Sequence, residues 1–195
     1  MLLRAVRPFA QHPRVCQIVV ALPAAVLHEP PEWLQSVAGQ RLRLVEGGAT
    51  RAQSVKAALD ALDEICTIVL IHDAARPFVS PETIENVIRI AGETGALPGI
   101  PVSDTLKRVE RETGEVVGTV DREGLWRAQT PQGFPRRMLE LAYERVGVAE
   151  LPGFTDEAAL FEAAGFPVRL VADSDRNVKI TTASDFAMAE AFARS

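Results

Sequence analysis

One stretch of the sequence, residues 67–77, constrains the fold more than any other. It reads Thr-Ile-Val-Leu-Ile-His-Asp-Ala-Ala-Arg-Pro, so five residues suited to a strand buried on both faces lead into a carboxylate, two small residues, an arginine and a proline. This order is typical of an inner parallel strand, whose C-terminal end carries polar side chains. Ligands of open α/β sheets bind at that edge. Asp73 and Arg76 are therefore either part of a ligand site or two turn residues that pair with each other.

Strand and helix patterns alternate along most of the chain. Apolar runs predict strands at residues 15–22, 42–45, 67–71, 96–102 and 168–172, and a shorter one at 178–181. Amphipathic patterns predict helices between them, such as the one that Ser80 and Pro81 begin. The alternation predicts an α/β fold, a Rossmann-like, mostly parallel sheet with helices on both faces, in one domain over residues 1–195. Residues 125–134 have no clear pattern and are expected to be irregular.

A charged connector interrupts this alternation. Residues 110–115 read Glu-Arg-Glu-Thr-Gly-Glu and separate two strand-like segments, 104–109 and 116–120. The pattern predicts a β-hairpin arm over residues 103–122 that protrudes from the sheet. A two-stranded ribbon is only marginally stable in water by itself. We therefore expect the arm to lie against this subunit or against a second copy of it.

The charge and the cysteines limit the classes of function. A formal net charge of -5 argues against a general nucleic-acid binder, whereas a small phosphorylated substrate needs only a few local cations. No apolar run reaches membrane-spanning length, and the N-terminus has no signal-peptide pattern. Cys16 and Cys66 lie in or beside apolar runs without metal-ligand spacing, which predicts buried thiols in a reducing compartment. A cytoplasmic protein without membrane or nucleic-acid partners is expected.

Polar side chains gather at the expected ends of the strands. Hydroxyl, guanidinium and ammonium groups outnumber carboxylates there, so the site is expected to favour anions. His72 is expected to orient a neighbour rather than to act as a base, and no serine lies in a nucleophile-elbow pattern. Chemistry based on positioning and charge neutralisation, such as phosphoryl or nucleotidyl transfer, fits best. The candidate residues are Gly48, Ser54, Asp73, Arg76, Asp104, Thr105, Arg122, Thr130, Thr155 and Lys179.

The candidates also have purely structural readings. Thr155 is the expected N-cap of a helix. Arg122 follows an aspartate with which it can form a local ion pair. Lys179 lies between two apolar residues, a pattern that is also typical of a lysine on the exposed face of a half-buried strand. The glycine pair at residues 47–48 precedes a helix, where such a pair is often no more than a turn.

Seven short motifs occur in order along the chain, and together they resemble one family. They are Gly-Gly-x-x-Arg-x-x-Ser-Val at 47–55, His-Asp-Ala-Ala-Arg-Pro at 72–77, Asp-Thr-x-Lys at 104–107, Thr-Val-Asp-Arg at 119–122, Thr-Pro-Gln at 130–132, Thr-Asp-Glu-Ala at 155–158 and Asn-x-Lys-Ile-Thr at 177–181. The chain resembles the 2-C-methyl-D-erythritol 4-phosphate cytidylyltransferases of the non-mevalonate isoprenoid pathway. The resemblance runs through essentially every residue present.

The resemblance implies a reaction. The phosphate of methylerythritol phosphate attacks the α-phosphorus of CTP, pyrophosphate leaves, and 4-diphosphocytidyl-methylerythritol forms with Mg²⁺ assisting. Asp73 and Ala74 would lie at the ribose and the metal-bound phosphate, which makes Asp73 the implied metal ligand, and Arg122 and Lys179 would orient the attacking phosphate. The other implied contacts are Gly48 and Ser54 with the cytidine portion, and Arg76, Thr105, Thr130 and Thr155 with methylerythritol phosphate.

The hairpin of this family reaches across a two-fold axis. The resemblance therefore implies a homodimer in which Arg122 serves the neighbouring subunit's site. Two other functions stay open. One is a cytidylyltransferase for a pentitol phosphate such as ribitol 5-phosphate, which shares the fold and several motifs. The other is a non-catalytic remnant that dimerises through the arm.

The chain departs from the family at its start. Family members begin with a strand and a glycine-rich loop, Pro-Ala-Ala-Gly-x-Gly-x-Arg, and continue to a Pro-Lys-Gln segment, whereas the printed sequence contains neither motif. We expect the chain to be N-terminally incomplete. Because that loop, with its Arg and the later Lys, grips the triphosphate, we expect no useful turnover from these residues alone. A sheet that lacks this strand should also contain an unfilled slot with exposed backbone.

Overall fold

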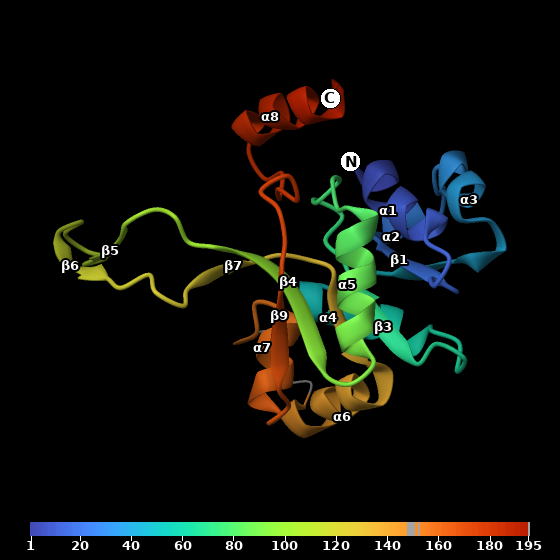
Figure 1. Cartoon of the computed structure of the whole chain (residues 1–195). Coiled ribbons are helices and arrows are strands. Elements are labelled where there is room, and N and C mark those ends of the chain that lie inside the picture. The colour runs from blue at the N-terminus through green and yellow to red at the C-terminus, as the bar shows by residue number, and fades with distance from the viewer. Residues whose placement is uncertain (148–150, 152, 195) are drawn as a thin grey trace.

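The computed structural model describes residues 1–147, 151 and 153–194, and it contains two main sheets (Figure 1). In the first sheet, β1 (Ile18–Leu22) pairs in parallel with β2 (Leu42–Glu46). The second sheet has the order β3-β8-β4-β7, and β9 also pairs with β4. Its strands are β3 (Ile68–Ile71), β4 (Gly95–Pro101), β7 (Trp126–Ala128), β8 (Gln132–Pro135) and β9 (Val168–Ala172).

Helices cover both faces of the second sheet. Successive side chains of a strand point to opposite faces, and in β3 the side chains on both faces are apolar. Val69 and Ile71 of β3 face the core shared with α4, α6 and α7, whereas Ile68 and Leu70 face α1 and α5. This arrangement confirms the expected α/β class with helices on both faces. The helices are α1 (Leu2–Gln11), α2 (Ala24–Leu27), α3 (Glu32–Ala38), the 3-10 turn η1 (Gly39–Arg41), α4 (Arg51–Asp60), α5 (Pro81–Ala91), α6 (Arg136–Val146), α7 (Glu157–Ala163) and α8 (Ala183–Arg194).

The strand pairing is more mixed than the mostly parallel sheet that the sequence predicts. β1 with β2 and β4 with β9 are parallel, but β8 pairs antiparallel with β3 and with β4, and β7 pairs antiparallel with β4. Residues 125–134, expected to be irregular, supply β7 and the start of β8. Pro131 and Gly133 interrupt the alternation of apolar and polar residues from which β8 could have been predicted. Gly133 is needed because a Cβ there would lie 2.6 Å from Val87 Cγ1 of α5.

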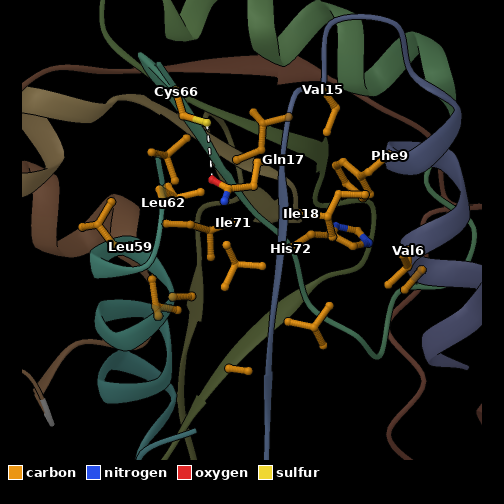
Figure 2. Close-up of a pocket in the computed structure, with 18 of the residues that line it drawn as sticks. Val6, Phe9, Val15, Gln17, Ile18, Leu59, Leu62, Cys66, Ile71 and His72 are labelled. Carbon is orange, nitrogen blue, oxygen red and sulfur yellow. Dashed lines mark hydrogen bonds between the residues drawn. The ribbon is translucent and has the colours of Figure 1, made fainter. Parts of the chain in front are cut away.

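A gap separates the two sheets. In the described residues β1 pairs only with β2, and β3 only with β8, so each keeps one edge without a partner strand. A cavity of about 760 Å³ lies between these edges, lined by residues 15–21 and 67–75 and by side chains of α1, α4 and α5 (Figure 2). We call this cavity the strand slot. It agrees with the expected unfilled position in the sheet, and in the described residues β3 pairs with a strand on one side only.

The expected hairpin forms and projects away from the sheets (Figure 1). β5 (Leu106–Val109) pairs antiparallel with β6 (Val116–Val120), with an irregularity between Arg108 and Val109. Two apolar side chains of β6, Val116 and Val117, are 61% and 58% exposed. The arm therefore presents apolar surface that the described part of its own chain leaves uncovered.

Two further expectations are corrected. Residues 178–181 do not form a strand; they are extended, and Ile180 N donates to Ala75 O at 2.8 Å. Cys16 is exposed rather than buried, and its Sγ lies 3.1 Å from the buried Cys66 Sγ. A search of the described helices for one with the length and apolar character to cross a membrane found none.

Candidate functional site

Asp73 follows β3 at its C-terminal end and collects three cations around one carboxylate. Its oxygens lie 3.0 Å from Lys179 Nζ, 3.3 Å from Arg51 Nε and 3.8 Å from Arg76 Nε. Burial by itself would raise the pKa of Asp73, but the contacts with Lys179 and Arg51 outweigh burial and hold this pKa below its ordinary value. Three cations against one carboxylate leave the cluster with an excess of positive charge. Such an excess favours anionic ligands, as we expect from the sequence.

A chain of hydrogen bonds fixes the backbone of Asp73. Its N–H donates to Thr130 Oγ1 at 3.0 Å, and that hydroxyl lies 2.9 Å from His72 Nδ1. The other ring nitrogen, Nε2, lies 2.9 Å from the carbonyl oxygen of Arg76. A carbonyl can only accept, so Nε2 carries the proton and Nδ1 accepts from Thr130. Burial lowers the pKa of His72 to about 4, which keeps this ring neutral at pH 7. His72 therefore orients its neighbours, as the sequence predicts.

Arg76 is buried and already holds two carbonyl groups. Its Nη1 donates to Asn177 O at 2.7 Å and its Nη2 to Ala128 O at 3.3 Å. Its Nε has no hydrogen-bond partner in the described residues. Burial lowers the pKa of Arg76. The guanidinium thus joins the end of β7 to the extended segment with two of its five N–H groups, and Nε–H is among the three donors that remain.

Lys179 reaches Asp73 from the extended segment that precedes α8. Buried Asn177 anchors this segment, because its Nδ2 donates to Thr130 O at 2.9 Å and to Asp173 Oδ2 at 2.8 Å. The side chain of Lys179 is 45% exposed, so the ammonium lies at the border between the cluster and solvent. Residues far apart in the sequence, at the ends of β3 and before α8, are therefore brought together as predicted.

The glycine-containing turn before α4 lies beside this cluster. Thr50 and Gln53 form a capping box at the start of the helix, and Ser54 Oγ accepts from Gly48 N at 3.1 Å. A Cβ at Gly48 would lie 2.3 Å from Gln53 Cβ, so only glycine allows this close turn. Ser54 lines the strand slot together with Asp73, Ala74 and Lys179.

Arg51 and Glu157 form an ion pair that the sequence analysis missed. Arg51 Nη1 lies 2.6 Å from Glu157 Oε2, and Glu157 is only 2% exposed. Tyr143 Oη donates to the other oxygen of Glu157 at 3.4 Å. Burial raises the pKa of Glu157, while Arg51 opposes this rise. Both residues lie inside the quoted motifs, but Glu157 looks like an ordinary first-turn acid because spacing cannot show that it turns inward.

Asp156, and not Thr155, caps α7. Asp156 Oδ1 accepts from Ala159 N at 2.9 Å, which corrects the expected cap. Buried Gln132 fixes this helix start, since it donates to Asp156 Oδ2 at 2.9 Å and accepts from Ala158 N at 3.1 Å. Thr155 is exposed and helps to line a small cavity of about 120 Å³ that also contacts Asp73, Arg76, Thr130 and Lys179.

The remaining candidates, Asp104, Thr105 and Arg122, lie on the arm. All three are exposed and do not line either of these cavities in the same chain. Arg122 donates to the carbonyl of Ser103 across the base of the hairpin. The structure therefore gathers Asp73, Arg76, Thr130, Thr155 and Lys179 at one place, with Gly48, Ser54 and Ala74 beside them, and leaves the arm residues apart.

The structure is an α/β protein with a cationic cluster at the ends of its strands, the edge at which ligands of open α/β sheets bind. The comparison with known proteins gives the family. The family described as "IspD: 2-C-methyl-D-erythritol 4-phosphate cytidylyltransferase" matches residues 1–195, and the chain belongs to it.

Individual relatives agree with this assignment. The 2-C-methyl-D-erythritol 4-phosphate cytidylyltransferase of Solibacter usitatus is 41% identical over 204 residues, covering 100% of this chain and 81% of the relative. The bifunctional enzyme IspD/IspF of Desulfotalea psychrophila is 40% identical over 196 residues, covering 100% of this chain and 49% of the relative. Against the bifunctional enzyme of Chelativorans, 51% identical over 151 residues, the match covers 37% of the relative. The chain thus spans about half, or less, of the bifunctional relatives it matches.

A solved structure shares the fold. The crystal structure of 2-C-methyl-D-erythritol 4-phosphate cytidylyltransferase from Thermus thermophilus superposes with a TM-score of 0.84 at 36% identity, covering 100% of this chain and 90% of that chain. The mixed strand pairing therefore belongs to a fold that a cytidylyltransferase of known structure also has.

Proposed function

We propose that this chain carries the site for cytidylyl transfer from CTP to 2-C-methyl-D-erythritol 4-phosphate, with release of pyrophosphate. The observation that supports this most is the Asp73 cluster, in which one carboxylate meets three cations at the end of a strand, in a chain of this family. In phosphoryl-group transfer, positioning and charge stabilisation provide most of the catalysis, and no covalent nucleophile is needed.

The proposed roles follow the positions of the residues. Gly48 and Ser54 hold the cytidine portion, and Ala74 lets the ribose approach the backbone. Lys179 and Arg122 orient the attacking phosphate, and Arg122 does so from the neighbouring subunit. The pocket for methylerythritol phosphate is assigned to Arg76, Thr105, Thr130 and Thr155.

Thr130 serves this pocket mainly as a positioning residue. Its hydroxyl accepts from Asp73 N and donates to His72, so one lone pair is left for a ligand. Arg76 uses one N–H of each terminal nitrogen on a carbonyl and keeps Nε–H and two further N–H groups as donors. The side chains of these two residues thus shape the pocket more than they fill it.

Mg²⁺ is the proposed cofactor, and Asp73 is its proposed protein ligand. The described residues contain no group of three or more His, Cys, Asp or Glu side chains that could hold a metal ion. A single carboxylate still fits Mg²⁺, because this ion is commonly bound by one or two carboxylates together with water and substrate phosphates. When bound, it would neutralise phosphate charge. Lys179 Nζ lies 3.0 Å from Asp73 Oδ2 and would compete with the ion for this carboxylate.

A homodimer through the arm is part of the proposal. The exposed valines of β6 support it, because a ribbon with apolar surface gains stability when that surface is covered. Sedimentation should show a dimer for the wild type and a monomer for Val117→Asp, and the far-UV circular dichroism spectra of the two should agree. A monomeric wild type would overturn this part.

A comparison of two binding affinities tests which sugar-alcohol phosphate is the substrate. Binding of methylerythritol phosphate and of ribitol 5-phosphate is measured by calorimetry at saturating CTP and Mg²⁺, and methylerythritol phosphate should bind at least about tenfold more tightly, a difference of about 1.4 kcal/mol. Tighter binding of ribitol 5-phosphate would favour the pentitol alternative. Binding of neither compound, nor of CTP, would favour a non-catalytic dimerising protein.

Turnover of a polypeptide with these 195 residues is expected to be poor. The sequence contains no Pro-Ala-Ala-Gly-x-Gly-x-Arg loop, and charge stabilisation of the transferred group is the main catalytic effect in this chemistry. The assay measures pyrophosphate release with CTP, Mg²⁺ and methylerythritol phosphate. A rate near that of the Solibacter relative would contradict the expectation.

The cytoplasmic location stays a prediction.

A further inference from the structure

The side chain of Glu157 is buried and reaches the candidate site only through Arg51. Glu157 is 2% exposed. Its Oε2 accepts from Arg51 Nη1 at 2.6 Å, and its Oε1 accepts from Tyr143 Oη at 3.4 Å. Within the part of the chain that the structure describes, Glu157 lines neither the strand slot nor the small cavity beside Asp73. Any effect of this carboxylate on a ligand must therefore pass through Arg51.

Arg51 lies between two carboxylates. Its Nη1 donates to Glu157 at 2.6 Å, whereas its Nε donates to Asp73 Oδ1 at the longer distance of 3.3 Å. The side chain of Arg51 is 35% exposed and lines both cavities, so it has room to move. Without the negative charge of Glu157, Asp73 would be the one remaining ion-pair partner of Arg51 among the described residues. We expect the guanidinium then to close on Asp73.

The start of α7 holds Glu157 in place. Gln132 of β8 donates to Asp156 Oδ2 at 2.9 Å and accepts from Ala158 N at 3.1 Å. It thus binds the residues on both sides of Glu157. Because the acid is fixed in this way, Arg51 is the side chain that can shift between the two carboxylates.

Stability by itself gives little reason for a buried ion pair of this kind. Such a pair can often be replaced by apolar residues of similar volume without loss of stability, because the desolvation of two charges offsets their attraction. The outer partners of a metal-binding carboxylate, by contrast, commonly change metal affinity or activity by about 10–100-fold when they are replaced. The position of the Arg51–Glu157 pair next to Asp73 therefore points to a role in the site.

The charges around Asp73 show what this role is. Lys179, Arg51 and Arg76 all contact the carboxylate, and each of them competes with a bound metal ion for it. With Glu157 included, two negative charges stand against three positive ones. Without Glu157, one negative charge would stand against three, and repulsion of a divalent cation would be stronger. Loss of Glu157 thus disfavours a cation at Asp73 both through charge and through the position of Arg51.

We propose that Glu157 is a positioning residue, which holds the guanidinium of Arg51 back from Asp73 so that this carboxylate stays available to the divalent cation of a bound nucleotide. The inference rests on the proposed function, since it takes Asp73 as the protein ligand of that cation. It assigns to the site a second acid, on α7, that does not touch the ligand.

The increase in CTP affinity that Mg²⁺ provides tests this role. Calorimetry gives the dissociation constant of CTP in EDTA and in Mg²⁺, and we call the ratio of the two the Mg²⁺ gain. Glu157→Gln should lower the Mg²⁺ gain by about tenfold. In EDTA this variant should bind CTP no more weakly than the wild type does, because it has one negative charge fewer. Damage to the fold alone would instead weaken CTP binding in both conditions.

A double variant and a matched surface acid complete the test. Arg51→Met combined with Glu157→Gln leaves no unpaired buried charge and frees Asp73 from Arg51, so the Mg²⁺ gain should return to at least the wild-type value. Glu140→Gln is the control, because Glu140 accepts from Arg136 Nε at 2.7 Å on α6 and lines neither cavity. It should keep the wild-type gain. If Glu157→Gln does not fold, Glu157→Met removes the same charge and has the same expected result.

The outcomes separate this inference from the proposed function. A wild type that binds no CTP in either condition would overturn both. A wild type that binds CTP without any dependence on Mg²⁺ would overturn the metal role of Asp73 and the inference with it. An unchanged Mg²⁺ gain in Glu157→Gln would overturn the inference alone, as would a gain that stays low in the double variant or an equal reduction in Glu140→Gln.

Discussion

The two sides of β3 differ sharply. Its C-terminal end leads into the Asp73 cluster, where Arg51, Arg76 and Lys179 surround one carboxylate. Its free edge faces the strand slot, where backbone groups and apolar side chains meet a cavity of about 760 Å³. The cluster is tightly connected although the neighbouring sheet is interrupted.

The connections explain this difference. The backbone of Asp73 is held by Thr130, which lies between β7 and β8. Its carboxylate contacts Arg51 of α4, which Glu157 of α7 anchors, and Lys179 of the segment that Asn177 anchors. None of these hydrogen bonds or ion pairs comes from β1. The cluster is therefore held without β1, although Arg51, Asp73 and Lys179 also line the slot.

The largest expected effect compares two leucines of the core. Leu139 of α6 is fully buried, whereas Leu59 of α4 is buried but borders the slot. Leu139→Ala should reduce the free energy of unfolding by about 4 kcal/mol, since it opens a new cavity, and Leu59→Ala by about 2 kcal/mol, since it widens an existing one. Urea unfolding measures both. Equal losses would mean that the slot is packed as tightly as the core.

The second prediction concerns the Arg51–Glu157 pair. Arg51→Met leaves the buried Glu157 without its cation and should cost about 3 kcal/mol in the free energy of unfolding. Lys56→Met is the control on the same helix, because Lys56 pairs with Asp60 on the surface at 2.6 Å. That variant should change stability by less than about 1 kcal/mol. A similar loss in the free energy of unfolding for both variants would show that the Arg51–Glu157 pair contributes no more than a surface ion pair.

The third prediction is a pH dependence that arises from His72. Its pKa is about 4 in the folded protein and 6.5 in its ordinary state, so the unfolded chain binds more protons between these values. The stability contributed by the neutral ring is complete above pH 6.5 and falls as the pH drops toward 4. We expect a loss of about 2 kcal/mol, because the half-buried ring keeps part of its hydration.

A variant isolates this effect. His72→Gln retains an acceptor for Thr130 but does not titrate, so its stability should change less than that of the wild type over the same pH range. The comparison is needed because the raised pKa of Glu157 acts in the opposite direction, favouring folding at lower pH. Parallel curves for the two proteins would show that His72 is not the titrating group.

Local patterns predicted much of this fold. Ser80 caps α5 with Pro81 in the first turn, and the charged connector forms the hairpin, as expected. Strand β8 was missed because Pro131 and Gly133 break the alternation that marks a strand, and β7 because its 3 residues are too few to show one. The buried pairing of Glu157 was missed because it depends on how α7 packs, which no spacing along the chain encodes.

The candidate site was predictable in its composition but not in its geometry. The position of Asp73 after a buried strand pointed to a sheet edge, and the motifs added Lys179 from far along the chain. The sequence does not show that Thr130 uses two of its three hydrogen bonds, and Arg76 two of its five donors, on the protein itself.

Calorimetry of CTP binding tests the central claim most directly. The wild type and Lys56→Met should bind CTP in the presence of Mg²⁺ with the same affinity, and Asp73→Asn should bind it at least about tenfold more weakly, because it removes the carboxylate proposed to hold the ribose and the metal ion. Equal affinity of all three proteins for CTP would contradict the assignment of a nucleotide site to the Asp73 cluster.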